Sequence, residues 1–317
     1  MLYYLKSLIK NSKKLLLIVL LISFSYIYYG NFIKKISNSD ILIDIPKNSS
    51  LKEISTIITQ NNLSRYNFFP FTISLLFGYE KKMNYGEYLV TNEDTLFSII
   101  KKIRYGNVYN RKMTIIEGYE KYQLLELIEN SILIKDDYKT SDYNLIGETF
   151  SYNKYQTVSS FLGKINNFTN NFLDNENVLN SYTNKEILII SSLVEKEGVD
   201  DNDKRLISSV IFNRLRKNMK LDIDASVIFS ITKGEYKLMR ALNFDDLKID
   251  SVYNTYKYKG LPPKPICIPG LNTIKIVLEN YESPFFYYFF DVNKKSHIFS
   301  KNYKKHLSKL NEYRKNK

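Results

Sequence analysis

The stretch TNKEILIISSLVEKEG, residues 183–198, carries a strong helical pattern that finishes on acidic residues. Thr183 and Glu186 form a capping box, which predicts the start of a helix. The helix should run to about Glu197, and Gly198 is a residue type that commonly stops a helix. Two carboxylates, those of Glu195 and Glu197, therefore stand where an apolar helix should be ending.

A helical projection separates these two carboxylates. One arc of about 120° contains the apolar side chains and also Glu197, whereas Glu195 falls beside Ser191 and Ser192 on a small, polar side. The apolar residues of the arc are Ile187, Ile190, Leu193 and Val194. A carboxyl group held against apolar walls has a raised pKa, which suits a general acid at neutral pH. The alternative is that the helix frays at Gly198 and Glu197 reaches water.

The net charge of +13 is concentrated at the two ends of the chain. Residues 1–35 contain six lysines and no acid, and residues 301–317 contain seven Lys or Arg and one acid. The body between them is close to neutral. A nucleic-acid-binding domain should carry its basic patch within the folded body, so a nucleic-acid partner is not expected.

Cysteine and histidine are scarce. The single Cys267 excludes an internal disulfide, and the two histidines form no Cys/His cluster in the sequence. We therefore expect no protein-built metal site and no cofactor.

An apolar segment near the N-terminus predicts a membrane anchor. Residues 15–33 would span about 28 Å as a helix, close to the thickness of a bilayer core. Tyrosines cluster at its far end, and the lysine bias favours a cytoplasmic N-terminus. The alternative is a cleaved signal peptide, but no small-x-small cleavage site follows. We expect a cytoplasmic basic tail at 1–14, an anchor at 15–33 and a body outside the cytoplasm.

The body reads as α+β. Residues 41–45 and 86–90 are predicted strands, and a helix capped by Ser49 or Ser50 follows the first. Further helices are predicted near 68–77 and 96–103, then a strand–turn–helix at 112–132. Residues 136–180 read as loops with one helix near 159–172. Beyond the opening stretch we expect a helix at 203–217, paired strands in FFYYFFDV and SHIFS, and a final helix at 302–314.

Four ordered motifs between residues 189 and 306 resemble the MltG (YceG-like) family of membrane-anchored endolytic murein transglycosylases. They are IISSLVEKEG, LISSVIFNRLRKNMKLDIDASVIFSI, SVYNTYKYKGLPPKPICIPGL and HIFSKNYKKH. Upstream, IDIPKNSSLKEISTII, GEYLV and TIIEG resemble the family's LysM-like module and the strand after it. The resemblance implies a small LysM-like α+β module at 37–108 and a larger mixed α+β catalytic domain at 109–317.

The resemblance also implies a reaction. Such enzymes cleave the β-1,4 bond between N-acetylmuramic acid and N-acetylglucosamine without water and leave 1,6-anhydro ends. The family's catalytic glutamate is the second acid of EKE, here Glu197, which the helical projection selects independently. Implied partners are nascent peptidoglycan strands, whose elongation the cut would terminate, and peptidoglycan synthases. The implied location is the cell (inner) membrane, with the catalytic domain periplasmic or extracellular.

Other matched residues receive substrate-binding roles, each with an alternative. Glu195 would orient the surroundings of Glu197 or pair with Arg214, or else be a solvated acid. Asn213 would donate to the glycan or serve as a packing amide. Asp224 would bind substrate or, as we favour, cap the helix that starts near Ala225.

The loop YNTY offers Tyr253, Asn254 and Tyr256 to sugar, with a packed loop as the alternative. Residues 260–270 are expected to form a rigid groove wall, and both His297 and His306 are expected to be structural hydrogen-bonding residues. The chain departs from the family pattern at Asp222, Lys264 and Ile268, which leaves subsite details open.

Two other functions stay open. A hydrolase of the inverting type would need Asp222 or Asp224 about 6.5–9.5 Å from Glu197. A non-catalytic glycan-binding scaffold would need neither.

Overall fold

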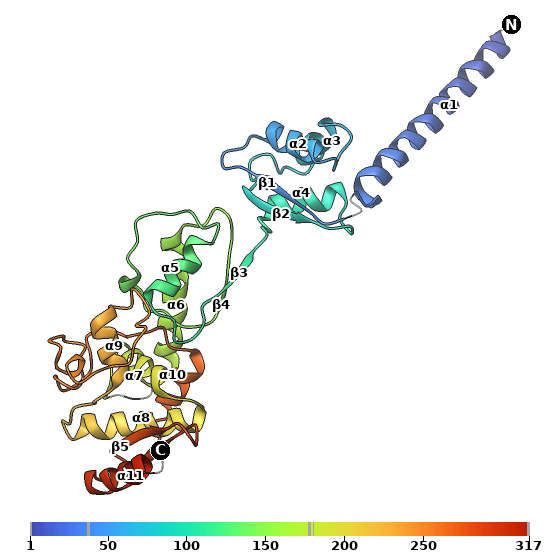
Figure 1. Cartoon of the computed structure of the whole chain (residues 1–317). Helices are drawn as coiled ribbons and strands as arrows, with labels where there is room; N and C mark the ends of the chain where they lie inside the picture. Colours follow the sequence, from blue (N-terminus) through green and yellow to red (C-terminus); the bar gives the residue numbers. More distant parts are fainter. Residues whose placement is uncertain (1, 37–38, 177–178, 180, 316–317) are drawn as a thin grey trace. The chain divides into compact units, whose positions relative to one another are not determined.

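The computed structural model describes residues 2–36, 39–176, 179 and 181–315. The chain forms two compact units, Met1–Arg111 with Asn153–Tyr155, and Lys112–Tyr152 with Gln156–Lys317. Figure 1 shows the elements of each unit. The expected module boundary at residue 37 lies outside the described residues. The architecture is mixed α+β, as the sequence predicts.

The first unit opens with a long apolar helix. The helix α1 (Leu2–Tyr28) continues into a short π-helix, η1 (Tyr29–Ile33), so residues of the expected basic tail are helical too. The segment Lys13–Ile33 has a mean hydropathy of 1.9, and its side chains are largely exposed. It is long and apolar enough to cross a membrane, and a signal sequence would have the same character.

The rest of the first unit is a small β-α-α-β-α fold, as predicted. Strands β1 (Ile41–Ile45) and β2 (Gly86–Val90) pair antiparallel. They are accompanied by α2 (Leu51–Gln60), α3 (Phe68–Leu76) and α4 (Leu96–Tyr105). Ser50 caps α2 through a capping box with Glu53. The core side chains come from both strands and all three helices.

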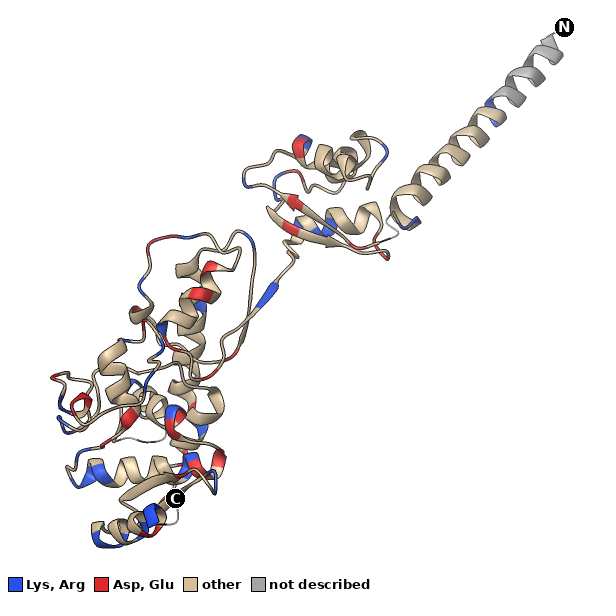
Figure 2. Cartoon of the chain, in the orientation of Figure 1, with Lys and Arg blue, Asp and Glu red and all other residues tan. Residues whose placement is uncertain are grey.

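The second unit consists of helices with two small two-stranded sheets. Its strands are β3 (Arg111–Thr114) with β4 (Thr149–Tyr152), and β5 (Tyr287–Asp291) with β6 (Ser296–Ser300). Its α-helices are α5 (Lys121–Glu129), α6 (Val158–Glu176), α7 (Asn184–Glu197), α8 (Asp201–Arg216), α9 (Asp224–Thr232), α10 (Leu271–Leu278) and α11 (Tyr303–Lys315). Short 3-10 turns are η2 (Thr140–Asp142) and η3 (Asp246–Lys248). Positive and negative residues are mixed over the helices, with a basic cluster on α11 (Figure 2).

Helix α7 is the central element of this unit. It contacts α6, α8, α9 and α10, and every residue from Ile187 to Val194 is buried. The prediction of a small, polar side at Ser191 and Ser192 holds for residue size, but that side is not exposed. Ser192 donates to the carbonyl of Ile189 and accepts from the backbone N–H of Ile266. Small hydroxyl side chains let the 264–268 segment lie directly against α7.

Several segments differ from the sequence expectation. Helix α6 is longer than the predicted 159–172, and β4 and α10 were not predicted. The paired strands near the C-terminal end of the sequence and the helix after them are confirmed as β5, β6 and α11.

Candidate active site

Glu197 is the last residue of α7, and the chain turns at once into α8. A Cβ atom at Gly198 would lie 2.3 Å from Cγ of Lys204 and 3.2 Å from the carbonyl oxygen of Val194. Only glycine allows α8 to approach α7 this closely. The turn leaves Glu197 half-buried at the junction rather than on a frayed, solvated end.

The surroundings of Glu197 raise its pKa to about 7. Burial is the main cause, because it penalises the charged carboxylate, and the nearby negative charge of Asp224 adds to it. His297 and the backbone N–H of Ala225, in the first turn of α9, act in the opposite direction. The result is a carboxyl group that can both give and take a proton near neutral pH.

A buried hydrogen-bonded pair of side chains lies near Glu197. His297 of β6 and Asp203 of α8 share a hydrogen bond, with Nδ1 and Oδ2 2.7 Å apart, and their side chains are 4% and 7% exposed. The prediction that His297 is a structural hydrogen-bonding residue is confirmed. The same prediction for His306 is wrong at Nδ1, which has no hydrogen-bond partner among the described residues. Its ring instead packs against Tyr287 and Tyr303.

Tyr288 of β5 is a residue that sequence reasoning missed. Its ring meets His297 edge-on, with centroids 5.2 Å apart. Its hydroxyl group is buried and has no hydrogen-bond partner within the described chain. Burial raises its pKa well above the ordinary value, and the charge of Glu197 adds to the rise. Five aromatic residues adjoin it in sequence, and no sequence signal singles it out.

Asp224 and Tyr256 form a hydrogen-bonded pair beside Glu197. The hydroxyl group of Tyr256 donates to Oδ1 of Asp224 over 2.6 Å. Burial and this carboxylate raise the pKa of Tyr256. The predicted N-cap at Asp224 is wrong, because α9 already begins at Asp224, Ile223 holds the cap position and no side-chain cap bond forms. The carboxylate of Asp224 is engaged by the tyrosine instead.

Two of the readings expected for Glu195, an ion pair with Arg214 and a solvated acid, are wrong. Its carboxylate accepts from Nζ of Lys204 over 2.7 Å and from the backbone N–H of Gly270 over 2.8 Å. The Glu195 and Lys204 side chains are 6% and 14% exposed, so the acid is not solvated. The expected partner, Arg214, is 3.2 Å from Asp222 instead. Glu195 thus ties α7 to α8 and to the residue that precedes α10.

Two candidate amides are packing groups. Asn213 donates both amide hydrogens, to the carbonyls of Ser283 and Phe285. Asn254 is fully buried and donates to the carbonyls of Leu247 and Ile249. Neither amide has a hydrogen left for a sugar, so the packing alternative holds for both.

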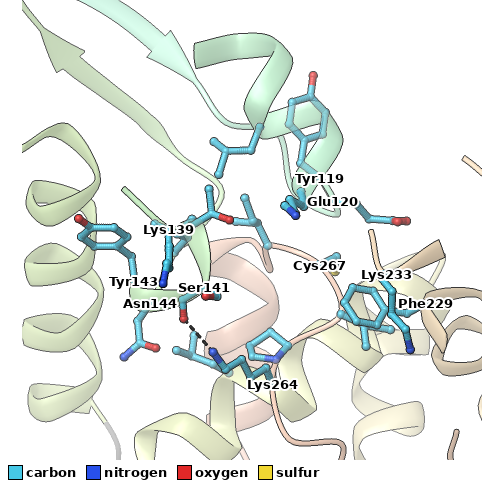
Figure 3. Close-up of a pocket in the computed structure, with 18 of the residues that line it drawn as sticks. Tyr119, Glu120, Lys139, Ser141, Tyr143, Asn144, Phe229, Lys233, Lys264 and Cys267 are labelled. Carbon is cyan, nitrogen blue, oxygen red and sulfur yellow. Dashed lines mark hydrogen bonds between the residues drawn. The ribbon is translucent and has the colours of Figure 1, made fainter. Parts of the chain in front are cut away.

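Tyr253 lies apart from Glu197's immediate partners and lines a cavity of about 720 Å³. Its ring packs on Phe229, with centroids 4.7 Å apart. Residues 264–268 of the expected groove wall at 260–270 line this cavity, and Glu197 is not among the lining residues, so a wall of the glycan groove there stays a prediction. Figure 3 shows this cavity with Phe229, Lys233 and Cys267 along it. In the described part of the chain no group of three or more His, Cys, Asp or Glu could hold a metal.

Comparison with known proteins identifies the family. Residues 43–312 match the model of the YceG-like family, which is most of the chain. The chain belongs to the YceG-like family.

Relatives of this YceG-like chain are endolytic murein transglycosylases. The Bacillus subtilis (strain 168) protein is 25% identical over 319 residues, which cover 89% of this chain and 87% of the relative. The Streptococcus pneumoniae serotype 2 (strain D39) protein is 24% identical over 332 residues, covering 87% of this chain and 59% of the relative. A crystal structure of a YceG-like protein from Listeria monocytogenes aligns with a TM-score of 0.52 and 24% identity, over 86% of this chain and 99% of that one. This similarity establishes the fold alone.

In this YceG-like chain, the groups around Glu197 come from distant parts of the sequence. Asp224 and Ala225 open α9, Tyr256 lies in the loop after η3, and Tyr288 and His297 are diagonal neighbours in the β5–β6 hairpin. The arrangement places the hydroxyl groups of Tyr256 and Tyr288 near one carboxyl group whose pKa is about 7.

Proposed function

We propose that this YceG-like chain is an endolytic lytic transglycosylase that cleaves the β-1,4 bond between N-acetylmuramic acid and N-acetylglucosamine in nascent peptidoglycan. The observation that carries the proposal is the half-buried Glu197, whose pKa is about 7. The family membership and the names of the relatives support the substrate class. The cut would terminate elongation of the glycan strand.

Glu197 would act first as acid and then as base. Its carboxyl proton is transferred to the glycosidic oxygen as the bond from that oxygen to C1 of the muramic acid breaks. The resulting carboxylate then takes the proton of the C6 hydroxyl of the same sugar, and that oxygen bonds to C1. The products are a 1,6-anhydro-muramic acid end and a new N-acetylglucosamine 4-hydroxyl group, and Glu197 is again protonated. A pKa near 7 suits a group that must perform both transfers.

The two neighbouring aspartates favour this one-carboxyl reaction over hydrolysis. A hydrolase of the inverting type needs a second carboxylate that activates water. Asp222 forms an ion pair with Arg214, and Asp224 accepts a hydrogen bond from Tyr256. Neither is a free base, so we assign Asp224 and Tyr256 to substrate positioning around Glu197. Glu195 would brace the site through Lys204.

The remaining assignments follow from the same proposal. Residues 15–33 would anchor the chain in the cell membrane, with residues 1–14 in the cytoplasm and the body outside. Residues 37–108 would form a LysM-like module that holds glycan near the membrane, and residues 109–317 the catalytic domain. Peptidoglycan synthases, which release nascent strands there, would be the partners.

The test is digestion of purified peptidoglycan by the full chain in detergent micelles, with mass spectrometry of the released ends. We expect anhydro-muramic ends from the wild type and a loss of at least a thousandfold with Glu197→Gln. Glu282→Gln, an exposed acid in the same unit, serves as the matched control and should retain activity. Reducing ends that contain added water would replace the proposal with a hydrolase. Glycan binding without any cleavage would replace it with a scaffold.

A further inference from the structure

A cavity near the candidate site is lined by positively charged side chains that the proposed cleavage reaction does not use. The lysine pocket, as we name it, is the cavity of about 720 Å³ lined by the start of α5, residues 138–141 and 143–145, Lys185 and Leu188 of α7, the end of α9 with Glu235, Tyr253 and residues 264–268. All of these belong to the second unit. In Figure 3, Lys139, Lys264 and Lys233 are distributed around the opening.

Most of the positive charge in the lysine pocket is uncompensated. Its two acids are already paired, Glu120 with Lys196 at 2.6 Å and Glu235 with Lys121 at 2.9 Å. The other four lysines that line it form no ion pair with any carboxylate of the described residues; they are Lys139, Lys185, Lys233 and Lys264. Two of them donate hydrogen bonds to neutral oxygens, Lys233 to Ser251 and Lys264 to Ser141, and Lys233 also lies over the Tyr253 ring. An anionic ligand would find several ammonium groups available here.

The walls between these lysines are largely apolar and aromatic. Tyr138, Tyr143, Phe229 and Tyr253 line the pocket together with Leu188 and Ile266. Such a surface suits an anion attached to an aliphatic body. An uncharged sugar has no group that matches four ammonium groups, whereas a short peptide with free carboxylates matches both the charges and the walls.

Helix α9 connects the pocket to Glu197. The backbone N–H of Ala225, in its first turn, acts on Glu197, while Phe229 and Lys233 reach the pocket. Four to eight residues of helix correspond to about 6–12 Å along the axis. On the other side, Lys196, the neighbour of Glu197 in sequence, binds Glu120 of the pocket. The α9 end of the pocket thus lies within about 12 Å of the Glu197 end, and Lys185 lies about 18 Å from Glu197 along α7, so a substituent that reaches these lysines must be the length of an extended peptide of several residues.

We propose that the lysine pocket binds the carboxylates of the peptide that the muramic acid of the substrate carries on its lactyl group. The inference rests on the proposed function and deepens it, because it makes peptide-bearing glycan the preferred substrate. The ammonium groups of Lys139 and Lys185 bind the carboxylates, and the aromatic walls contact the aliphatic peptide side chains.

The first test is a binding measurement that does not depend on cleavage. A soluble muramyl tetrapeptide with free carboxylates is titrated into the full chain carrying Glu197→Gln in micelles, and the dissociation constant is measured by calorimetry. The double variant Lys139→Gln/Lys185→Gln should weaken binding at least tenfold, and amidation of the peptide carboxylates should weaken it as much. Lys304→Gln, an exposed lysine on α11, is the charge-matched control and should change nothing.

The inference is overturned if the muramyl tetrapeptide does not bind, if the double variant binds it equally well, or if inorganic phosphate competes at the same concentration.

A second test compares cleavage of peptide-bearing and peptide-free glycan. Equal cleavage of both by the wild type would also refute the pocket's role, while the proposed function would stand. Lysine-dependent peptide binding in a chain that cuts neither glycan would support the pocket and refute the proposed function.

Discussion

At the scale of single residues, two carboxylates separated by one lysine have opposite surroundings. Glu195 receives an ammonium group and a backbone N–H, so its charge is compensated. Glu197 is half-buried and has the negative charge of Asp224 nearby, so its protonated form is favoured. A two-residue difference in helical position thus separates an acid whose charge is paired from one whose pKa is raised to about 7.

The raised pKa of Glu197 leads to a prediction about how the free energy of unfolding depends on pH. Its pKa is about 7 in the folded chain against an ordinary 4.5. The unfolded chain therefore releases this proton first, and folding stability should fall as pH rises from about 4.5 to 7. Glu197→Gln abolishes that loss, so the variant should be more stable than wild type by up to about 3 kcal/mol above pH 7 and equal to it near pH 4. Chemical denaturation across pH measures the difference; a constant difference at all pH values would contradict the assigned pKa.

The same pKa makes a prediction about rate. The reaction needs Glu197 protonated at its start, so turnover at saturating glycan should fall about tenfold per pH unit above pH 7. Substituting Asp224 with Asn removes a negative neighbour and should lower the pKa of Glu197, which moves the alkaline limb of the profile to lower pH. An unshifted limb would show that Asp224 does not influence the acid.

Glu195 provides a test of the bracing role. Glu195→Ala leaves Lys204 buried without its charge partner, and we expect a loss of about 3–5 kcal/mol in the free energy of unfolding. The control is Glu279→Ala, which removes the exposed ion pair with Arg205 on the same helix α8 and should cost less than about 1 kcal/mol. Similar losses in the two variants would mean that the buried Glu195–Lys204 pair stabilises the fold no more than the exposed Glu279–Arg205 pair does.

At the scale of elements, the α7–α8 turn depends on one glycine. Gly198→Ala places a methyl group 2.3 Å from the Lys204 side chain and near the α7 backbone, so α8 must shift. We expect the free energy of unfolding to fall by about 1–3 kcal/mol. Cleavage activity should fall by more than this loss of stability explains, because Glu197 directly precedes the turn. Gly163→Ala is the matched control, because a Cβ atom there meets nothing within 4 Å inside α6 and should stabilise the chain by about 0.5–1 kcal/mol. Thermal unfolding and cleavage assays on both variants decide the matter.

Elements with local signals are the ones that the sequence predicts. The capping box and the apolar period identify α7, and the position of Glu197 on its apolar arc follows from the same pattern. The partner of Glu195 could not be predicted, because it depends on how tightly the chain turns at Gly198. That turn brings the first turn of α8, with Lys204, beside α7, whereas Arg214 lies about 15 Å further along α8.

Other features depend on contacts that are distant in sequence. The short helix α10 contains the run IKIV, which suits a strand as well as a helix, and its packing on α7 and α8 decides the outcome. Tyr288 is one of several adjacent aromatic residues, and only the β5–β6 pairing places it opposite Phe299 and near His297. Ser191 and Ser192 read as a polar face because no local signal reveals that α7 is covered on all sides.

At the scale of the whole molecule, the apolar segment Lys13–Ile33 should decide where the chain resides. We expect the full chain to fractionate with membranes and to resist carbonate extraction, and a chain that begins at residue 39 to be soluble. Fractionation followed by intact-mass measurement checks both. A full-length product that is soluble and shorter by the N-terminal segment would identify a cleaved signal peptide instead of an anchor.

The hydrogen bond between His297 and Asp203 has a consequence for the order in which the protein becomes active. The ribosome synthesises Glu197 about a hundred residues before His297, and Tyr288 is also synthesised long after Glu197. A nascent chain that has exposed the acid therefore lacks the hairpin that completes its surroundings. Under the proposed function, cleavage would therefore begin only after the β5–β6 hairpin has been made, and a chain interrupted before this hairpin would leave glycan intact.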